Sequence, residues 1–93
     1  MIVGVLQLQV SVFEAVNLKD KRRVLLSLKD RIRQKFNVSI AEVDYNDSIR
    51  TALLGVALVA NESRFVDSVL SHIVDFVRRD PRVSLVDYTL ETF

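Results

Sequence analysis

The spacing of apolar residues alternates along the chain between the two-residue period of a strand and the 3.6-residue period of a helix. Near the N-terminus, Leu6, Leu8 and Val10 alternate with Gln7 and Gln9, as in a strand with one buried face. The whole pattern predicts strand, helix, strand, strand, helix, strand. Strands are predicted over residues 2–12, 38–43, 51–60 and 83–93, and the first helix over residues 17–36.

Both predicted helices have start or stop signals. Asn17, with Asp20 three residues later, matches a capping box at the start of the first helix. Asn61 or Ser63 can cap the second helix. That helix should end near Asp80, because the proline at position 81 disfavours helical geometry in the residue before it.

This order of elements predicts an α+β fold. Two right-handed crossovers around an antiparallel middle pair give a ferredoxin-like βαββαβ sandwich, a four-stranded antiparallel sheet with two helices on one face. Residues 51–60 are apolar on both faces, which is typical of a central strand. The 93 residues are enough for one such domain, predicted over residues 1–93.

Composition narrows the class of protein. The chain has no cysteine, which excludes disulfides and thiolate metal sites. Its longest apolar run, residues 52–60, has about half the length of a membrane-spanning helix. The apolar N-terminus contains two glutamines and no preceding basic region, unlike a signal peptide. We therefore expect a cytoplasmic protein without a membrane anchor.

Charge is distributed unevenly along the chain. Residues 19–35 contain eight basic and two acidic residues, a balance of +6, whereas the rest of the chain amounts to −5. Basic side chains in the first helical turns oppose the helix dipole by about 0.3–1 kcal/mol each at low salt. A solvated surface helix explains such a run as well as a polyanion-binding surface does, and both interpretations stay open at this point.

Three segments resemble the YlxP-like family of small bacterial proteins. They are the opening VGVLQLQV, NLKDKRR at residues 17–23 and FNVSIAEVD at residues 36–44. The resemblance covers essentially the whole chain. It implies a ferredoxin-like fold and an intracellular bacterial protein of unknown function, often encoded beside translation-initiation and ribosome-maturation genes. Asn17 replaces the usual serine, and the aromatic residue common near positions 48–49 is absent. The family has no agreed catalytic residues to carry over.

The leading hypothesis is a non-enzymatic binding protein that contacts RNA or the ribosome through its first helix. The candidate phosphate contacts are Lys19, Lys21, Arg22, Arg23, Lys29 and Arg33. Free backbone N–H groups at the helix start could add to this site. The first and third strands lack the aromatic residues on which RNA-recognition domains stack bases, so contacts would go to phosphates.

Other patterns favour ordinary structural explanations. The acids Glu42, Asp44 and Asp47 lack the spacing of a calcium loop and are expected to guard an edge strand. His72 is the single histidine and has no recognisable catalytic partner. The sequence therefore predicts no enzyme activity, cofactor or metal site.

The alternative hypothesis is a homodimeric structural or regulatory module. Two helices cover one face of the predicted sheet, although residues 51–60 are apolar on both faces. Val3 and Val5 add to the uncovered face. Open apolar faces commonly form interfaces, although small residues such as Gly55 and Ala57 reduce the area available here.

Overall fold

The computed structural model describes all residues from Met1 to Phe93 and consists of four strands and two helices. In chain order these are β1 (Ile2–Ser11), α1 (Leu18–Lys35), β2 (Ser39–Asp44), β3 (Thr51–Ala60), α2 (Ser63–Arg78) and β4 (Ser84–Thr92). The predicted order of elements is confirmed, and the boundaries lie close to those expected from the apolar spacing.

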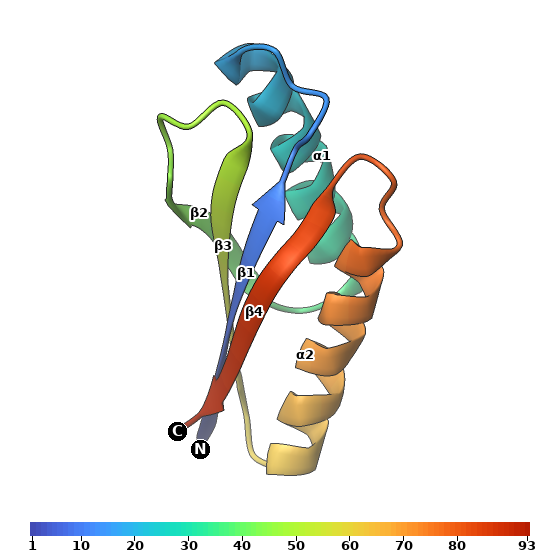
Figure 1. The fold of residues 1–93 in the computed structure, drawn as a ribbon. Coiled ribbons are helices and arrows are strands. Elements are labelled where there is room, and N and C mark those ends of the chain that lie inside the picture. The colour runs from blue at the N-terminus through green and yellow to red at the C-terminus, as the bar shows by residue number, and fades with distance from the viewer.

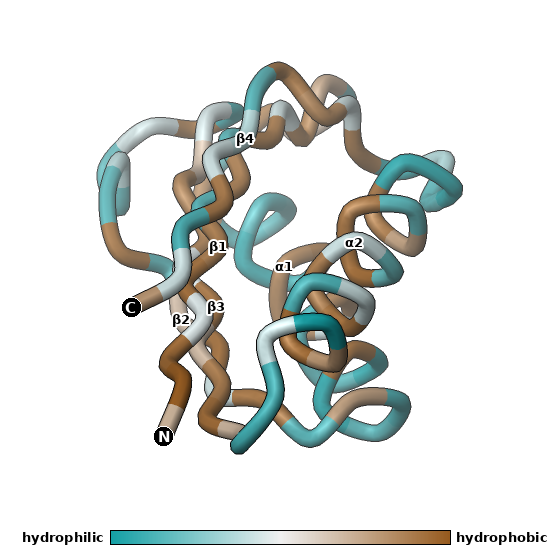
Figure 2. Tube along the Cα trace, turned by 90° about the horizontal axis from the view of Figure 1, so that it is seen from below, coloured by the Kyte–Doolittle hydropathy of each residue, from teal (hydrophilic) through white to brown (hydrophobic).

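The strands form one antiparallel sheet in the order β2-β3-β1-β4, so β1 and β3 are central as predicted. Both helices lie on the same face of this sheet, and no element covers the opposite face (Figures 1 and 2). The two termini lie together at one end of the sheet (Figure 1), where Val3 N donates to Phe93 O at 3.0 Å.

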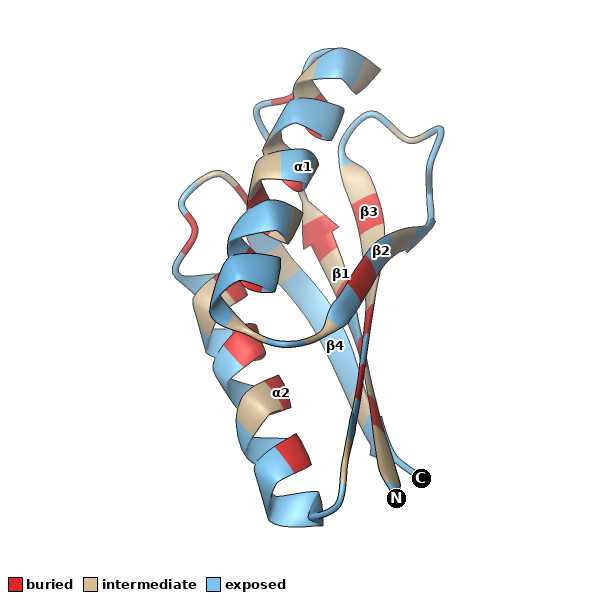
Figure 3. Cartoon of the chain, turned by 180° about the vertical axis from the view of Figure 1, so that it is seen from behind, coloured by how far each residue is buried: buried red, intermediate tan, exposed pale blue.

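The hydrophobic core lies between the sheet and the helices. Leu6, Leu8 and Val10 are fully buried on the helix-facing side of β1, as their alternation predicted. The helices present buried inner sides and exposed outer sides (Figure 3). Gly4 lets α2 lie close to β1, because a Cβ at this position would overlap Val66 and lie 2.9 Å from Leu70 Cδ1.

The two helix starts differ in how well the sequence predicted them. Asn17 is the N-cap of α1, and its side chain accepts a hydrogen bond from Asp20 N at 2.9 Å. The Asp20 carboxylate reaches back to Val16 N at 3.1 Å, one residue beyond the partner in a standard capping box. The predicted cap of α2 is wrong. Glu62 has the extended cap backbone there and makes no side-chain cap bond, while Ser63 already belongs to the helix.

A bulge changes the predicted faces of β4. Gln9 pairs with Asp87 and Val10 pairs with Leu85, so Val86 is an extra residue without a partner in β1. Regular alternation along residues 83–93 would place Val86 on the same face as Tyr88 and Leu90, but Val86 is 59% exposed. Leu85 instead takes the position opposite the buried Val10.

The loop between α2 and β4 is fastened to α1 through the buried carboxylate of Asp80. Arg82 donates to both Asp80 oxygens, with Nε 3.0 Å from Oδ1 and Nη2 2.7 Å from Oδ2. Arg31 of α1 donates to Oδ2 at 3.2 Å, and Arg82 Nη1 donates to the Ser27 hydroxyl at 3.0 Å. The hydrogen bonds from Arg82 lower the pKa of Asp80, and they outweigh the opposing effect of burial.

The turn between β2 and β3 is fastened to α1 by a second buried charge. The Lys21 side chain is 1% exposed, and its Nζ lies 2.7 Å from both Tyr45 O and Ser48 O. Glu42 Oε2 lies 2.8 Å from the same nitrogen and forms an ion pair with it, but this oxygen is buried and accepts no hydrogen bond. The buried ammonium is therefore held by two hydrogen bonds to backbone carbonyls and one ion pair. Tyr45 adopts a left-handed backbone conformation with φ of 61°, which is uncommon for a residue other than glycine.

We expect Asp80→Asn to lower the free energy of unfolding at pH 7 by about 2 kcal/mol, because it removes a charged acceptor of several hydrogen bonds. The difference in free energy of unfolding between wild type and variant should depend on pH. A folded-state pKa below the ordinary 3.8 gives stabilisation that is present above pH 3.8 and is lost as the pH falls below it. Urea denaturation at pH 7, 5 and 3 should therefore show the gap between wild type and variant closing at the lowest pH. A gap independent of pH would contradict this account.

We expect Lys21→Met to lower the free energy of unfolding by roughly 3 kcal/mol, because Glu42 and two carbonyl groups lose their buried partner. The double variant Lys21→Met with Glu42→Leu should recover part of this loss, since it also removes the uncompensated carboxylate. Urea denaturation monitored by circular dichroism measures both. A loss below about 1 kcal/mol, the range of a surface ion pair, would show that Lys21 does not hold the turn.

Candidate functional site

The outer surface of α1 carries the exposed cations of the molecule's most basic segment. Lys19, Arg22 and Arg23 are exposed and take part in no ion pair. Leu26, 56% exposed, lies on the same outer surface. These three side chains agree with the sequence prediction in position, since they are free to contact a ligand from solvent.

Lys21 was also predicted as a phosphate contact, and the structure contradicts that role. Its ammonium is buried, donates to the carbonyl groups of Tyr45 and Ser48, and forms an ion pair with Glu42. The helical period explains the difference. Lys21 lies on the inward stripe with Leu25 and Leu28, where the turn between β2 and β3 supplies acceptors. Lys21 therefore has a structural role, and we exclude it from the candidate site.

Arg33 lies on the flank of α1 next to β2, and Lys29 lies one turn earlier on the same flank. Lys29 is half-buried and makes no ion pair. Arg33 donates through Nη2 to Ile40 O at 2.8 Å, and its Nη1 lies 3.3 Å from Asp30 Oδ1. Because these bonds use part of the guanidinium, Arg33 contributes less free charge to the surface than Lys29. We keep both residues in the site.

The start of α1 is a poorer anion site than the sequence predicted. Asn17 already accepts the Asp20 N–H, and the Asp20 carboxylate lies at the same turn, bonded to Val16 N. A bound anion there would meet this negative charge. The cationic site therefore consists of side chains on the outer surface of α1 and on its flank next to β2, and we call these residues the α1 surface: Lys19, Arg22, Arg23, Lys29 and Arg33.

The remaining cations of α1, Arg31 and Lys35, make contacts where the two helices meet. Arg31 pairs with Asp80 and lies 5.0 Å from the centre of the Phe76 ring. Lys35 lies 5.3 Å from the same ring. Phe36 meets Phe76 edge to face, at 6.0 Å between ring centres. Contacts between cations and aromatic faces stabilise this junction of the two helices.

The uncovered face of the sheet is the second surface of interest. None of the four strands contains a lysine or arginine, so every cation except that of the N-terminus lies in a helix or a loop. Following the strand register, the acidic residues on the uncovered face are Asp44, Asp87 and Glu91. The charge of the molecule is therefore divided between a basic helix layer and an acidic outer sheet face.

The β2–β3 half of this uncovered face is apolar and hollowed. A hollow of about 280 Å³ is lined in part by Val5, Val43 and Gly55. It shares Ser39 and Ala57 with a second hollow of about 470 Å³. We call these adjoining hollows the β2–β3 trough. The small side chains of Ser39 and Ala57 line both hollows. Val43 covers Gly55, where an added Cβ would be 2.9 Å from Val43 Cγ1.

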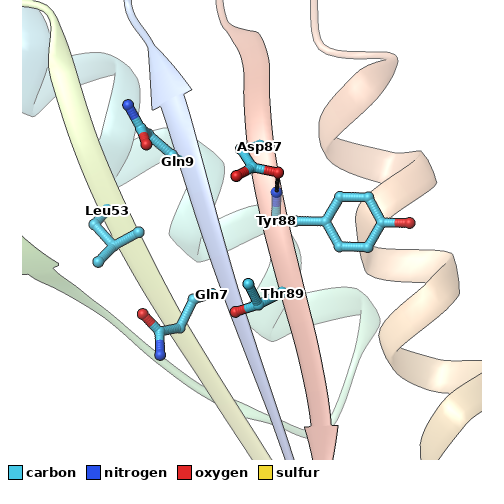
Figure 4. Close-up of a pocket in the computed structure, with 6 residues that line it drawn as sticks. All are labelled: Gln7, Gln9, Leu53, Asp87, Tyr88 and Thr89. Atoms are coloured by element: carbon cyan, nitrogen blue, oxygen red, sulfur yellow. Dashed lines mark hydrogen bonds between the residues drawn. The ribbon is translucent and has the colours of Figure 1, made fainter.

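The β1–β4 half of the same face is polar. Gln7, Gln9, Asp87 and Thr89 surround a small hollow of about 80 Å³ beside Leu53. Their side chains lie on the uncovered side of the sheet, whereas the Tyr88 ring extends toward α2 (Figure 4). Amide, hydroxyl and carboxylate oxygens thus lie next to the apolar half. Glu91, two residues after Thr89 on β4, adds a second carboxylate to the polar half.

The uncovered face could be predicted from the sequence, but its division into an apolar and a polar half could not. The absence of lysine and arginine from every strand was visible in the printed sequence. The trough was not, because it depends on which residues of β2 and β3 lie opposite each other. The predicted homodimer through this face stays a prediction.

Neither α1 nor α2 combines the length with the apolar character that a membrane-spanning helix requires.

Comparison with a solved structure agrees with the predicted architecture. A de novo designed protein with a ferredoxin fold, determined by solution NMR, matches with a TM-score of 0.55. The match covers 99% of this chain and 85% of the design. At 15% sequence identity it shows the fold alone, and the predicted ferredoxin-like sandwich is confirmed.

Comparisons of sequence identify the family. The chain is 30% identical over 81 residues to the uncharacterized protein YlxP of Bacillus subtilis (strain 168), a match that spans 87% of this chain and 88% of that protein. Residues 3–90 match the family model described as a protein of unknown function, DUF503. The resemblance noted in the sequence is confirmed, and the chain belongs to the DUF503 family.

Proposed function

We propose that this protein is a non-enzymatic binding protein that contacts RNA phosphates, free or within the ribosome, through the α1 surface. The observation that carries the proposal is the set of exposed cations without intramolecular partners, led by Lys19, Arg22 and Arg23. Unpaired charges of one sign on one surface repel each other, and a polyanion removes that repulsion.

The spacing of these cations suits a nucleic-acid backbone. Lys19 and Lys29 are ten residues apart, which corresponds to about 15 Å along a helix axis. A backbone that follows α1 over this length would meet several side chains in succession. Each phosphate neutralised releases condensed counterions, so the affinity should depend strongly on salt concentration.

The uncovered sheet face does not suit base recognition by stacking. At its centre β1 and β3 present Gln7, Gln9 and Leu53, and no aromatic ring. RNA-recognition domains of this general architecture stack bases on aromatic residues of those strands. The proposed contacts are therefore to phosphates, and we expect weak preference among RNA sequences.

We predict that a fluorescently labelled single-stranded RNA binds with an affinity that falls steeply with salt. Five phosphate contacts correspond to a slope of about −3.5 in a plot of log association constant against log salt concentration. Replacing Arg22 and Lys29 with glutamine should weaken binding and bring the slope to about −2, because two contacts are lost. Fluorescence anisotropy across a KCl series measures both quantities.

The matched control replaces Arg64 and Arg79 with glutamine, which removes two exposed cations from α2 and its end. This control should leave the salt slope at the wild-type value. Absence of RNA binding at low salt, or an affinity insensitive to salt, would contradict the proposal. An equal loss in the control and the α1 variant would show general attraction without a site on α1.

A further inference from the structure

The uncovered sheet face has a chemical character that the proposed RNA contact does not use. Its ionisable residues are the acids Asp44, Asp87 and Glu91, and it carries no lysine or arginine. Beside these acids the face exposes apolar side chains, including Val43 at 54% and Val59 at 62%. Apolar surface bordered by charge of one sign favours a partner with apolar groups and the opposite charge.

We propose that this face binds a basic amphipathic helix of a partner protein. The apolar side chains of that helix would occupy the β2–β3 trough, which is lined by Ser39, Val43 and Ala57. Its lysine and arginine side chains would lie over the β1–β4 half, against the carboxylates of Asp87 and Glu91. This inference concerns the opposite side of the molecule from α1 and is independent of RNA binding.

The dimensions of the face agree with a helix. A helix with its side chains is about 10–12 Å across, and two neighbouring strand intervals amount to about 10 Å. A helix lying over the boundary between β3 and β1 would therefore contact the trough on one side, and its long lysine and arginine side chains would reach the carboxylates of β4 on the other. The two halves of the face correspond to the two sides of an amphipathic helix.

The polar half contains groups suited to cationic side chains. Gln7, Gln9 and Thr89 offer oxygen acceptors around the same hollow as the Asp87 carboxylate (Figure 4). Asp87 Oδ1 accepts a hydrogen bond from Tyr88 N at 2.9 Å, which holds the carboxylate in place. Charge-assisted bonds from lysine or arginine would be stronger than bonds between neutral groups.

The negative charge of the uncovered face favours binding of a basic helix over binding of a second copy of this chain. Two copies packed face to face would bring together two surfaces with the same three acids and no cation between them. Like charges across an interface disfavour association, whereas a cationic helix neutralises them. An RNA strand would meet the same negative charge and is excluded from this face for the same reason.

The test uses a labelled amphipathic helical peptide of leucine and lysine, with a leucine and glutamate peptide of the same apolar spacing as its counterpart. We expect the lysine peptide to bind the wild-type protein and the glutamate peptide to bind at least about tenfold more weakly. Asp87→Lys combined with Glu91→Lys should weaken the lysine peptide about tenfold, because it reverses the charge of the polar half. Fluorescence anisotropy measures each affinity.

A second variant tests the trough independently. Ala57→Arg places a large cation on the exposed floor, so it should also weaken the lysine peptide without disturbing the buried core. The control Asp67→Lys with Asp75→Lys makes the same charge change on exposed positions of α2 and should bind like wild type. Circular dichroism of each variant checks that the fold is retained.

Three results would overturn the inference. They are no binding of the lysine peptide, equal binding of both peptides, and affinities that the β4 and Ala57 variants leave unchanged. A fourth such result would come from sedimentation equilibrium of the protein alone. If the wild type is a dimer and Ala57→Arg abolishes dimerisation, this face binds a second copy of the chain. RNA affinity of the same variants should not fall, which separates this inference from the proposed function.

Discussion

Two helices cover one face of this four-stranded sheet. The surfaces left for binding other molecules are therefore the outer side of the helices and the opposite face of the sheet. The helix-facing side chains of the strands, such as Leu6, Leu8 and Val56, form the core and are nearly inaccessible to water. Burial of this apolar area is the main favourable term in folding. Because each strand alternates its side chains between faces, filling one side of the sheet necessarily presents the other side to solvent.

The two surfaces left outside the core differ in charge. The helix layer contains the basic segment, whereas the strands contain no lysine or arginine and contribute Asp44, Asp87 and Glu91 to the outer face. This division supports two separate binding proposals, for RNA phosphates on α1 and for a basic helix on the sheet. If both proposals hold, one molecule would bind both ligands at once, since the core separates the two surfaces.

Buried ion pairs connect the helix layer to the loops that border it. Lys21 holds the turn between β2 and β3, and Asp80 holds the loop between α2 and β4. Each buried charge has a charged partner and further hydrogen bonds, as burial in a medium of low polarity requires. One basic helix thus supplies structural cations from its inner side and solvent-exposed cations from its outer side.

Apolar spacing by itself determined the order of the elements, the central position of β1 and β3, and the uncovered sheet face. These features follow from local periodicity, which the printed sequence contains. Only the tertiary structure decided that Lys21 is buried, that Glu62 caps α2, and that Val86 is an extra residue in β4. The first and the last of these depend on segments distant in sequence, because the acceptors of Lys21 lie on the turn after β2 and the bulge arises from pairing with β1. The number of lysines in α1 does not show which of them is buried. The packing of the helix against the sheet buries Lys21 and leaves the others at the surface.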